Sequence, residues 1–448
     1  MTDPAPATPV AAIPQSRRLG SWMSMAMVVG TMIGSGIYLL PATLAPFGPN
    51  IILAFAVTIA GTMCLAVAFA RLSSRIPGGP FAYVQSAFGE SPAFLTLWSY
   101  LISQWTGVAA VAVAVAGAIG FVLPAAGSGI GLTIVALGTI LILTLVNLTG
   151  ARSAGWVQLV ATLIKIIPLF AVVLLVAVRF GAGQPVEPLA AMPIGVAGIT
   201  AAAALMLFSL TGFESATVVA NVTEDSTHTV PRATILGTGF TGLIYLAATV
   251  ATLLLLPSAI AAKSGAPFAD AISPILGNGA GALVAVIAAI SAFGTCNALL
   301  LLSAEVGRSI AGANDLPPLF RRTNAAGAPT GSLLVAATVA SLLVLASSTE
   351  GFVQVYIFIA LVSTVASLVL YAVCAAAALK LKAMGGATII AILALIYSVA
   401  MFVGAGWEAT KWGFALALAG LPIRWLSRRF SFAATSPAAA ADPAAPWE

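Results

Sequence analysis

The chain has 448 residues, of which 60% are hydrophobic and 7% are charged, and its mean hydropathy is +1.09. A soluble surface normally needs about 25% charged residues, so this composition excludes a soluble globular protein and indicates a polytopic membrane protein. The net charge of +5 comes with no basic patch of interleaved aromatic residues, which excludes nucleic-acid binding.

Twelve apolar runs are long enough to cross a bilayer as helices of about 20 residues. They lie near residues 20–46, 50–72, 91–120, 130–149, 153–179, 195–222, 231–256, 279–311, 331–348, 352–379, 386–405 and 408–427. With the N-terminus inside, nearly all arginine and lysine residues fall in cytoplasmic loops, which is the charge asymmetry typical of membrane proteins. We therefore expect a multi-pass protein of the cell inner (cytoplasmic) membrane, embedded in the lipid bilayer, with both termini cytoplasmic.

The two ends of the chain differ from the rest in composition. Residues 1–18 and 430–448 have too few apolar residues to offset chain entropy, so both are expected to be disordered cytoplasmic tails. The N-terminal residues lack the charged and apolar regions of a signal peptide. The transporter domain is expected to cover residues 19–429.

The cysteine and histidine content bounds the chemistry inside the membrane. Cys64, Cys296 and Cys374 lie inside predicted spans without paired spacing, so they are expected to be small apolar residues. The single histidine, His228, lies in a predicted cytoplasmic loop. We expect no disulfide, no metal site, no cofactor and no histidine-dependent catalytic set.

The first span contains helix breakers near its middle, in Gly30-Thr31-Met32-Ile33-Gly34-Ser35-Gly36-Ile37-Tyr38. Unwinding there would free backbone amides, and the helix that resumes would point its positive end at them. The Ser35 hydroxyl and the amides of Ser35, Gly36 and Ile37 could then bind a substrate carboxylate. The alternative is a packing surface formed by Gly30 and Gly34.

Polar residues are rare in the other spans of the first half. In span 3, Tyr100 lies one helical turn before Gln104, which suggests a polar pocket wall. In span 5, Lys165 lies midway between Arg152 and Arg179, roughly 20 Å of helix from either end. A charge there costs about 2.5–3.5 kcal/mol on insertion scales and is by default a functional-site hypothesis. Lys165 could gain and lose a proton during turnover, or it could be a permanent internal counter-ion.

The sixth span, at 195–222, carries a second break in Ser209-Leu210-Thr211-Gly212-Phe213-Glu214. Broken helices at corresponding positions of two halves are the best sequence indication of a transporter substrate site. We therefore expect two repeats, at about 20–179 and 195–379, inserted with opposite orientation because each has an odd number of spans. Helices 11 and 12, at about 386–427, follow the repeats.

Short motifs occur in a fixed order from span 1 to the loop after span 8. They are Gly34-Ser35-Gly36-Ile37, Pro77-Gly78-Gly79 with Tyr83 and Phe88-Gly89, F-S-L-T-G-F-E at 208–214, Pro231-Arg232-Ala233, Phe293-Gly294 with Asn297, and Leu316-Pro317 with Phe320. In this order they resemble the amino acid–polyamine–organocation (APC) permease superfamily, and the chain is similar to bacterial basic amino acid/polyamine antiporters. The similarity extends to about residue 429.

This resemblance implies an all-α membrane protein of 12 transmembrane helices. It also implies the 5+5 inverted repeat of the leucine-transporter-like fold, with discontinuous helices 1 and 6, alternating access, and a substrate with an α-amino group.

By the same resemblance, free carbonyls at Met32, Phe208 and Thr211 would bind the substrate ammonium, and the Phe208 ring would cover the substrate. Asn297 is placed in the substrate site. Lys165 is similar to a lysine that replaces a sodium site, and Glu214 matches a carboxylate that bridges the broken segments or relays protons. For both charged residues a structural role stays open, as a counter-ion and as a hydrogen-bonded buried carboxylate respectively.

The chain departs from the arginine exchangers of this superfamily at two positions. Leu299 stands where they have a tryptophan that holds the guanidinium, and Val108 stands where they have an asparagine. The loss of the cation–π surface weakens the anchor for a long basic side chain. We therefore expect proton-coupled uptake of a small or medium neutral amino acid. The alternative is an ion-independent antiporter of basic amino acids or polyamines.

Other functional classes fit less well. No Ser/His pair or paired aspartates occur within the spans, so we expect no enzyme. The spans are too uniformly apolar for the continuous polar stripe of a channel. The expected partners are an amino acid, protons and lipid, and the expected state is a monomer or a homodimer.

Overall fold

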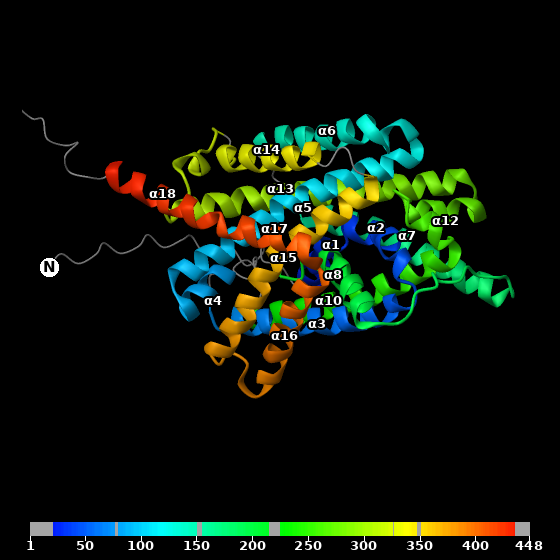
Figure 1. Cartoon of the computed structure of the whole chain (residues 1–448), viewed down its shortest axis with the longest axis horizontal. Helices are drawn as coiled ribbons and strands as arrows, with labels where there is room; N and C mark the ends of the chain where they lie inside the picture. Colours follow the sequence, from blue (N-terminus) through cyan, green and yellow to red (C-terminus); the bar gives the residue numbers. More distant parts are fainter. Residues whose placement is uncertain are drawn as a thin grey trace, which may run out of the picture.

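The computed structural model describes residues 21–76, 79–149, 155–214, 225–325, 327–346 and 351–434. Within these ranges every regular element is a helix (Figure 1). The first part contains α1 (Ser21–Met32), α2 (Ser35–Leu44), α3 (Asn50–Ser73), α4 (Gly79–Phe88), α5 (Glu90–Val122), α6 (Gly129–Leu148) and α7 (Gly155–Gly181). Then follow α8 (Val196–Leu210), α10 (Ser226–Leu255), α11 (Ser258–Ala261), α12 (Pro267–Leu276), α13 (Asn278–Gly312), α14 (Thr330–Ala346), α15 (Phe352–Lys380), α16 (Thr388–Gly404), α17 (Gly406–Leu418) and α18 (Gly420–Ala434).

The predicted all-helical membrane class is confirmed. Eight of the described helices are long and apolar enough to cross a membrane, and α1 and α2 add a ninth span bent by 40°. The helices that correspond to predicted spans 6, 9 and 12 are shorter, at 15, 17 and 13 residues for α8, α14 and α17. Span 6 is interrupted, α14 ends at the edge of a described range, and predicted span 12 is divided between α17 and α18.

The outer helices present apolar side chains to their surroundings. On α16 the exposed large residues are Ile389, Ile392, Leu393, Ile396, Val399 and Val403. They lie on one side, whereas Ala391, Ala394, Ser398 and Met401 are buried. Such a surface would cost free energy in water, whereas in a bilayer these side chains would contact the hydrocarbon of the lipid.

Several contacts between helices occur in related pairs. Replacing each helix of such a contact by the helix five spans away gives a second contact that is also present. The contact of α1 with α10 has its counterpart in that of α8 with α3. Likewise α7 contacts α1 and α10, while α15 contacts α8 and α3. The contacts α6–α13 and α14–α5 form a further pair, and α5 packs directly against α13 along much of its length (Figure 1). Several contacts of the first five spans therefore recur, in kind though not in extent, among the helices five spans later.

Several predicted segments lie outside the described residues. These are most of the two predicted tails, Arg152, and Pro77-Gly78 of the motif before α4. At the C-terminal end, α18 continues to Ala434, past the predicted tail boundary at residue 430. In Figure 1 this helix extends away from the bundle at the same end as α4.

Candidate substrate site at two broken helices

The predicted break in span 1 is present. Helix α1 ends at Met32 and α2 begins at Ser35, with Gly34 in an extended conformation between them. A Cβ on Gly34 would lie 2.7 Å from Thr295 Oγ1 of α13, and a Cβ on Gly36 would lie 2.5 Å from Ser209 Oγ of α8. The two glycines therefore permit close approach of span 1 to spans 8 and 6. They also give the backbone the conformational freedom that the break requires.

Hydrogen-bond donors gather at the start of α2. Ser35 is 2% exposed, and its hydroxyl has no hydrogen-bond partner. The amides of the first turn, at Ser35, Gly36 and Ile37, have no intrahelical acceptor, as in any α-helix. No side chain of the described residues caps them at the N-cap position. Because unsatisfied buried donors cost free energy, this arrangement is suited to an anionic group such as a carboxylate.

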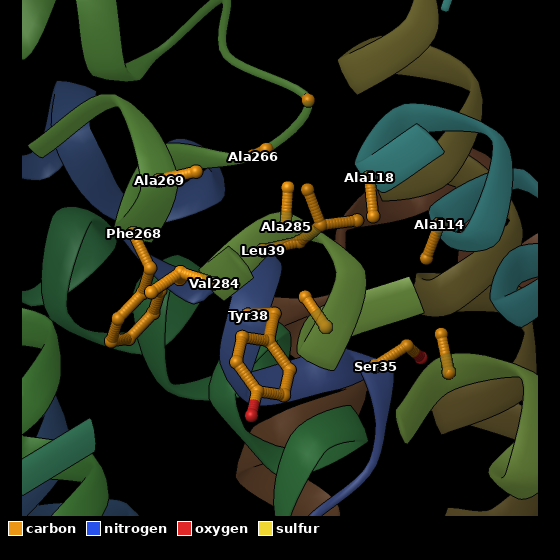
Figure 2. Close-up of a pocket in the computed structure, with 13 residues that line it drawn as sticks. Ser35, Tyr38, Leu39, Ala114, Ala118, Ala266, Phe268, Ala269, Val284 and Ala285 are labelled. Atoms are coloured by element: carbon orange, nitrogen blue, oxygen red, sulfur yellow. The ribbon is translucent and has the colours of Figure 1, made fainter. Parts of the chain in front are cut away.

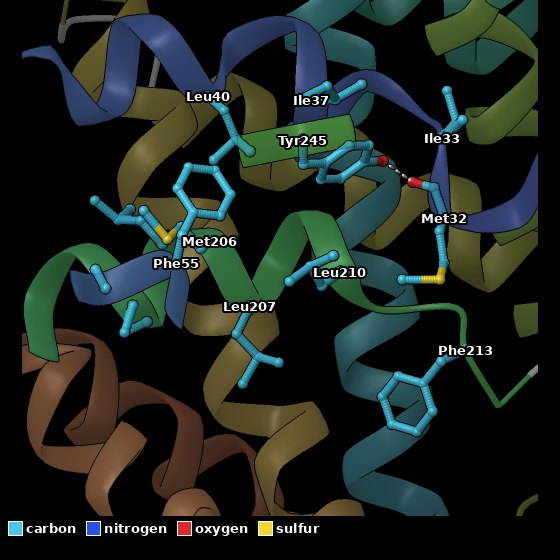
Figure 3. Close-up of a cluster of buried hydrophobic side chains, with 14 of the residues drawn as sticks. Met32, Ile33, Ile37, Leu40, Phe55, Met206, Leu207, Leu210, Phe213 and Tyr245 are labelled. Carbon is cyan, nitrogen blue, oxygen red and sulfur yellow. Dashed lines mark hydrogen bonds between the residues drawn. The ribbon is translucent and has the colours of Figure 1, made fainter. Parts of the chain in front are cut away.

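The carbonyls predicted to be free are partly occupied, which corrects the expectation for Met32 and Phe208. The Tyr245 hydroxyl of α10 donates a 2.6 Å hydrogen bond to the carbonyl oxygen of Met32 (Figure 3). The Thr211 hydroxyl donates to the carbonyl oxygen of Phe208 at 2.7 Å. The Met32 oxygen also accepts the Gly34 amide at 2.8 Å, so both of its lone pairs are used. An ammonium group would have to share the Phe208 oxygen with Thr211 and displace a donor from Met32.

The first part of the predicted break in span 6 is present, whereas residues 215–224, where this span would resume, lie outside the described residues. Helix α8 ends at Leu210, Thr211 is extended, and Gly212 has φ +105°, which disfavours any side chain. The Thr31 hydroxyl of α1 donates to the carbonyl oxygen of Gly212 at 3.2 Å. The two broken segments therefore contact each other directly, since a Cβ on Gly212 would lie 3.3 Å from the Thr31 carbonyl oxygen. Figure 3 shows Met32 and Phe213 on these two segments.

A buried carboxylate lies immediately after the second break. Glu214 is 4% exposed, and its Oε2 accepts the Gly212 amide at 3.1 Å. The hydroxyls of Tyr100 (α5) and Tyr371 (α15) donate to its Oε1 and Oε2, each at 3.3 Å. The structure thus brings the predicted residues Tyr100 and Glu214 together. It adds Tyr371, which sequence reasoning missed because a tyrosine between apolar neighbours follows no local pattern.

Lys165 lies on the buried face of α7. It is 6% exposed and shares that face with Thr162, Leu169 and Val172. The opposite face carries the exposed residues Leu163, Ile167, Phe170, Leu174 and Val178. The backbone carbonyl of Lys165 accepts a 2.7 Å hydrogen bond from the Tyr38 hydroxyl of α2. In the part of the chain that the structure describes, no carboxylate lies within ion-pair distance of its ammonium.

The remaining predicted site residues divide into two groups. The Phe208 ring meets Tyr356 of α15 edge-on, with centroids 6.0 Å apart. Gln104 is buried, and its Oε1 has no hydrogen-bond partner. In contrast, Asn297 accepts a 2.7 Å hydrogen bond from Asn147 of α6, so it faces α6 rather than the break. Leu299 packs over Gly107 of α5, where a Cβ would lie 3.3 Å from its methyl group.

A small cavity lies on the α2 side of the break (Figure 2). Ser35 and Tyr38 line it from α2, Ala114 and Ala118 from α5, and Ala288 from α13. Helix α12 covers it with residues that include Phe268. Most of the lining is apolar, so the Ser35 hydroxyl stands out as a polar group in its wall.

Among the described residues, no cluster of histidine, cysteine, aspartate and glutamate could hold a metal ion. The polar groups around the breaks are hydroxyls, amides, one amine and one carboxylate. Their arrangement can bind a zwitterion or an amine, and it contains no paired nucleophile and base.

Comparison with known proteins identifies the family of the chain. The family model described as "Amino acid permease" matches residues 19–404. The "Cadaverine/lysine antiporter" of Escherichia coli (strain K12) is 31% identical over 331 residues, which cover 72% of this chain and 73% of that protein. A Bacillus subtilis (strain 168) protein named "Putative arginine/ornithine antiporter" is 29% identical over 435 residues, which cover 87% and 92%. The chain is a multi-pass helical membrane protein with two broken helices, and the family model matches most of its length. It therefore belongs to the amino acid permease family and is a transporter, not an enzyme.

Proposed function

We propose that this permease is an antiporter that exchanges a basic amino acid or an amine across the cytoplasmic membrane by alternating access, without a coupling ion. The observation that carries the proposal is the pair of broken helices with a buried carboxylate beside them. The similarity to a cadaverine/lysine antiporter and to a putative arginine/ornithine antiporter supports the choice of exchange. It also favours cationic substrates over the neutral amino acid that the sequence suggests.

The helix break would bind the head of an amino acid. Its carboxylate would accept hydrogen bonds from the Ser35 hydroxyl and from the amides of Gly36 and Ile37, which have no other acceptor. Its ammonium would approach the carbonyls of Met32 and Phe208. An amine without a carboxylate would lose the first set of contacts, so its binding must depend more on positive charge.

Glu214 is suited to attract that positive charge. The carboxylate lies between two tyrosine hydroxyls at the site where spans 1 and 6 meet. In a region of low dielectric, an ion pair or a charge-assisted hydrogen bond is stronger than in water. A cationic substrate would therefore be favoured there, whichever amine group it presents.

Alternating access is supported by the corresponding helix contacts in the two halves, such as α1 with α10 and α8 with α3. We propose that spans 1–5 and 6–10 form the 5+5 inverted repeat of a leucine-transporter-like fold, with spans 11 and 12 appended. Equivalent helices that pack in equivalent environments allow two related conformations of similar free energy. The structure has α12 over the cavity at Ser35, so it corresponds to a state closed on that side.

A second candidate is proton-coupled uptake of a small or medium neutral amino acid. Two observations favour it: Lys165 is buried without a carboxylate nearby in the described part of the chain, and Leu299 packs over Gly107 without an aromatic surface. In this reading, Lys165 would exchange a proton during each cycle.

Transport by purified protein in liposomes separates the two candidates. The substrates are lysine, arginine, ornithine, cadaverine and alanine, each offered outside with the lumen either empty or loaded with the same compound. An antiporter takes up a cationic substrate only into loaded liposomes, whatever the pH gradient. Accumulation of alanine in empty liposomes with an alkaline lumen would instead support the symporter.

Variants at two lysines sharpen this test. Lys165→Ala should abolish gradient-driven accumulation if proton coupling operates. Lys411→Ala removes an exposed partner of Glu408 and should leave transport unchanged, which makes it a matched control. Failure of every substrate to exchange or accumulate in wild-type liposomes would refute both candidates.

A further inference from the structure

Tyr38 connects three elements that meet at the outer half of span 1. It belongs to α2 and is 5% exposed. Its ring meets Phe268 of α12 edge-on, with centroids 5.6 Å apart and an interplanar angle of 69°. Its hydroxyl donates a 2.7 Å hydrogen bond to the backbone carbonyl of Lys165 in α7. One side chain therefore contacts both the helix that covers the cavity and the span that carries the buried lysine.

The contact with α12 is part of the cover over the cavity (Figure 2). The Ser264 hydroxyl donates to the Asp270 carboxylate and accepts the Ala266 amide at 3.0 Å, which fixes the first turn of α12. Just before this helix, Gly265 lies against Gly117 of α5, where a Cβ on Gly117 would be 3.0 Å from the Gly265 carbonyl oxygen. The cover is therefore closely packed, and it can leave the cavity only if the contact between Phe268 and Tyr38 changes.

The contact with α7 fixes the backbone at Lys165. A buried hydroxyl that leaves its acceptor without finding another loses the full hydrogen bond. Among the described residues Tyr38 has no second acceptor, and the lining of the cavity around it is mostly apolar. The hydrogen bond therefore favours the arrangement in which α2, α7 and α12 are together.

We propose that Tyr38 is a positioning residue that couples closure of the α12 side to the position of span 5 at Lys165. In the closed state the hydroxyl holds the Lys165 backbone against α2 while the ring supports Phe268. Opening of the cavity toward the α12 side breaks the hydrogen bond and releases the Lys165 segment. The inference rests on the proposed alternating access and adds a specific link between the cover and span 5.

Tyr38→Phe tests the link because it removes the hydroxyl and keeps the ring. The parent carries Ala118→Cys, a reporter in the cavity wall, in a background in which Cys64, Cys296 and Cys374 are replaced by alanine. A membrane-impermeant maleimide is added on the α12 side, and the labelling rate is measured with and without lysine or cadaverine. Loss of one hydrogen bond should raise the labelling rate about five- to tenfold.

Tyr356→Phe is the matched control. Tyr356 is a buried tyrosine whose hydroxyl has no hydrogen-bond partner, so its removal should leave the labelling rate at the parent value. Phe268→Leu keeps the Tyr38 hydroxyl but loosens the ring contact. It should also raise the rate, and it provides the test if Tyr38→Phe does not fold.

The outcomes separate the inference from the proposed function. Equal labelling of Tyr38→Phe and Tyr356→Phe, in a parent whose labelling responds to substrate, overturns the role of Tyr38 alone. If Tyr38→Phe does not fold, unchanged labelling of Phe268→Leu overturns it in the same way. A parent whose labelling never responds to any substrate on either side contradicts alternating access, and the inference then fails together with it.

Discussion

The hydroxyl of Tyr245 in α10 lies 2.6 Å from the carbonyl oxygen of Met32, the last residue of α1. A helix that ends inside a membrane leaves carbonyl groups without intrahelical donors, and each unsatisfied polar group there costs several kcal/mol. At Met32 the Gly34 amide supplies one donor, at 2.8 Å, and span 7 supplies a second. The break is stabilised from a helix 213 residues away in the sequence.

Tyr245→Phe should weaken both the fold and the substrate site. Loss of the hydroxyl removes one of the two hydrogen bonds that the Met32 carbonyl accepts and leaves the Gly34 amide as its donor, which should lower the free energy of unfolding by about 0.5–1.5 kcal/mol. Substrate affinity should fall because Met32 belongs to the proposed ammonium site. Thermal unfolding in detergent and the KM for exchange measure the two effects. Tyr356→Phe, at a hydroxyl without a partner, should change neither, and an equal effect of the two variants would contradict this role.

Gly36→Ala should force the outer half of span 1 away from span 6. The new Cβ would lie 2.5 Å from Ser209 Oγ and 2.8 Å from Ser209 Cα, so α2 and α8 must separate. Overpacking of this kind costs about 1–3 kcal/mol, and transport should fall at least tenfold because the amides of the break are displaced. Gly138→Ala in α6 is the control, since nothing lies within 4 Å of its Cβ position. Normal transport by Gly36→Ala would show that the close approach is not required.

The two breaks were predictable from local sequence, because glycine and polar residues in the middle of an apolar run have a direct conformational consequence. The contacts that complete the site were not. Tyr371 is 157 residues from Glu214 in the sequence, and Tyr245 is similarly distant from Met32. Each lies between apolar neighbours in its helix, so its role depends on packing that no local pattern encodes.

Asn297 shows a different limit of sequence reasoning. It is two residues after Thr295, which lies against the break at Gly34. Two residues correspond to about 200° of rotation around an α-helix, so Asn297 points to the opposite side and pairs with Asn147 of α6. Assignment of a site residue from a nearby motif therefore requires the helix phase, which uniformly apolar neighbours do not reveal.

Glu214→Gln should reduce the affinity for cationic substrates more than for neutral ones. Glutamine keeps the size of the side chain and can still meet Tyr100 and Tyr371, but it lacks the negative charge. Competition by lysine and cadaverine against labelled substrate should weaken about 10- to 100-fold, with a smaller change for alanine. Glu305→Gln removes an exposed carboxylate paired with Arg308 and should have no effect. Equal weakening of lysine and alanine would indicate a structural role for Glu214.

Arg424→Met should destabilise the attachment of the C-terminal helix α18. The Arg424 side chain is 8% exposed, and its Nε lies 2.8 Å from Asp315 Oδ1, whose side chain is 5% exposed. Its Nη1 donates to Ser91 Oγ at 2.8 Å, so the residue connects α18 to the start of α5 and to the segment after α13. Loss of one partner of a buried ion pair costs about 3–5 kcal/mol, although Arg428, 2.7 Å from the same Asp315 oxygen, should reduce the loss.

Thermal unfolding in detergent measures this change, and two further variants identify its cause. Arg308→Met breaks an exposed pair with Glu305 and should cost about 0–1 kcal/mol. The double variant Arg424→Met with Asp315→Leu removes the buried carboxylate that has lost one of its two arginine partners and should recover part of the lost stability. If the single variant were as stable as Arg308→Met, α18 would not depend on this ion pair. If the double variant recovered nothing, the loss would come from packing of the arginine over the Phe94 ring, 4.9 Å from its guanidinium carbon, and not from charge.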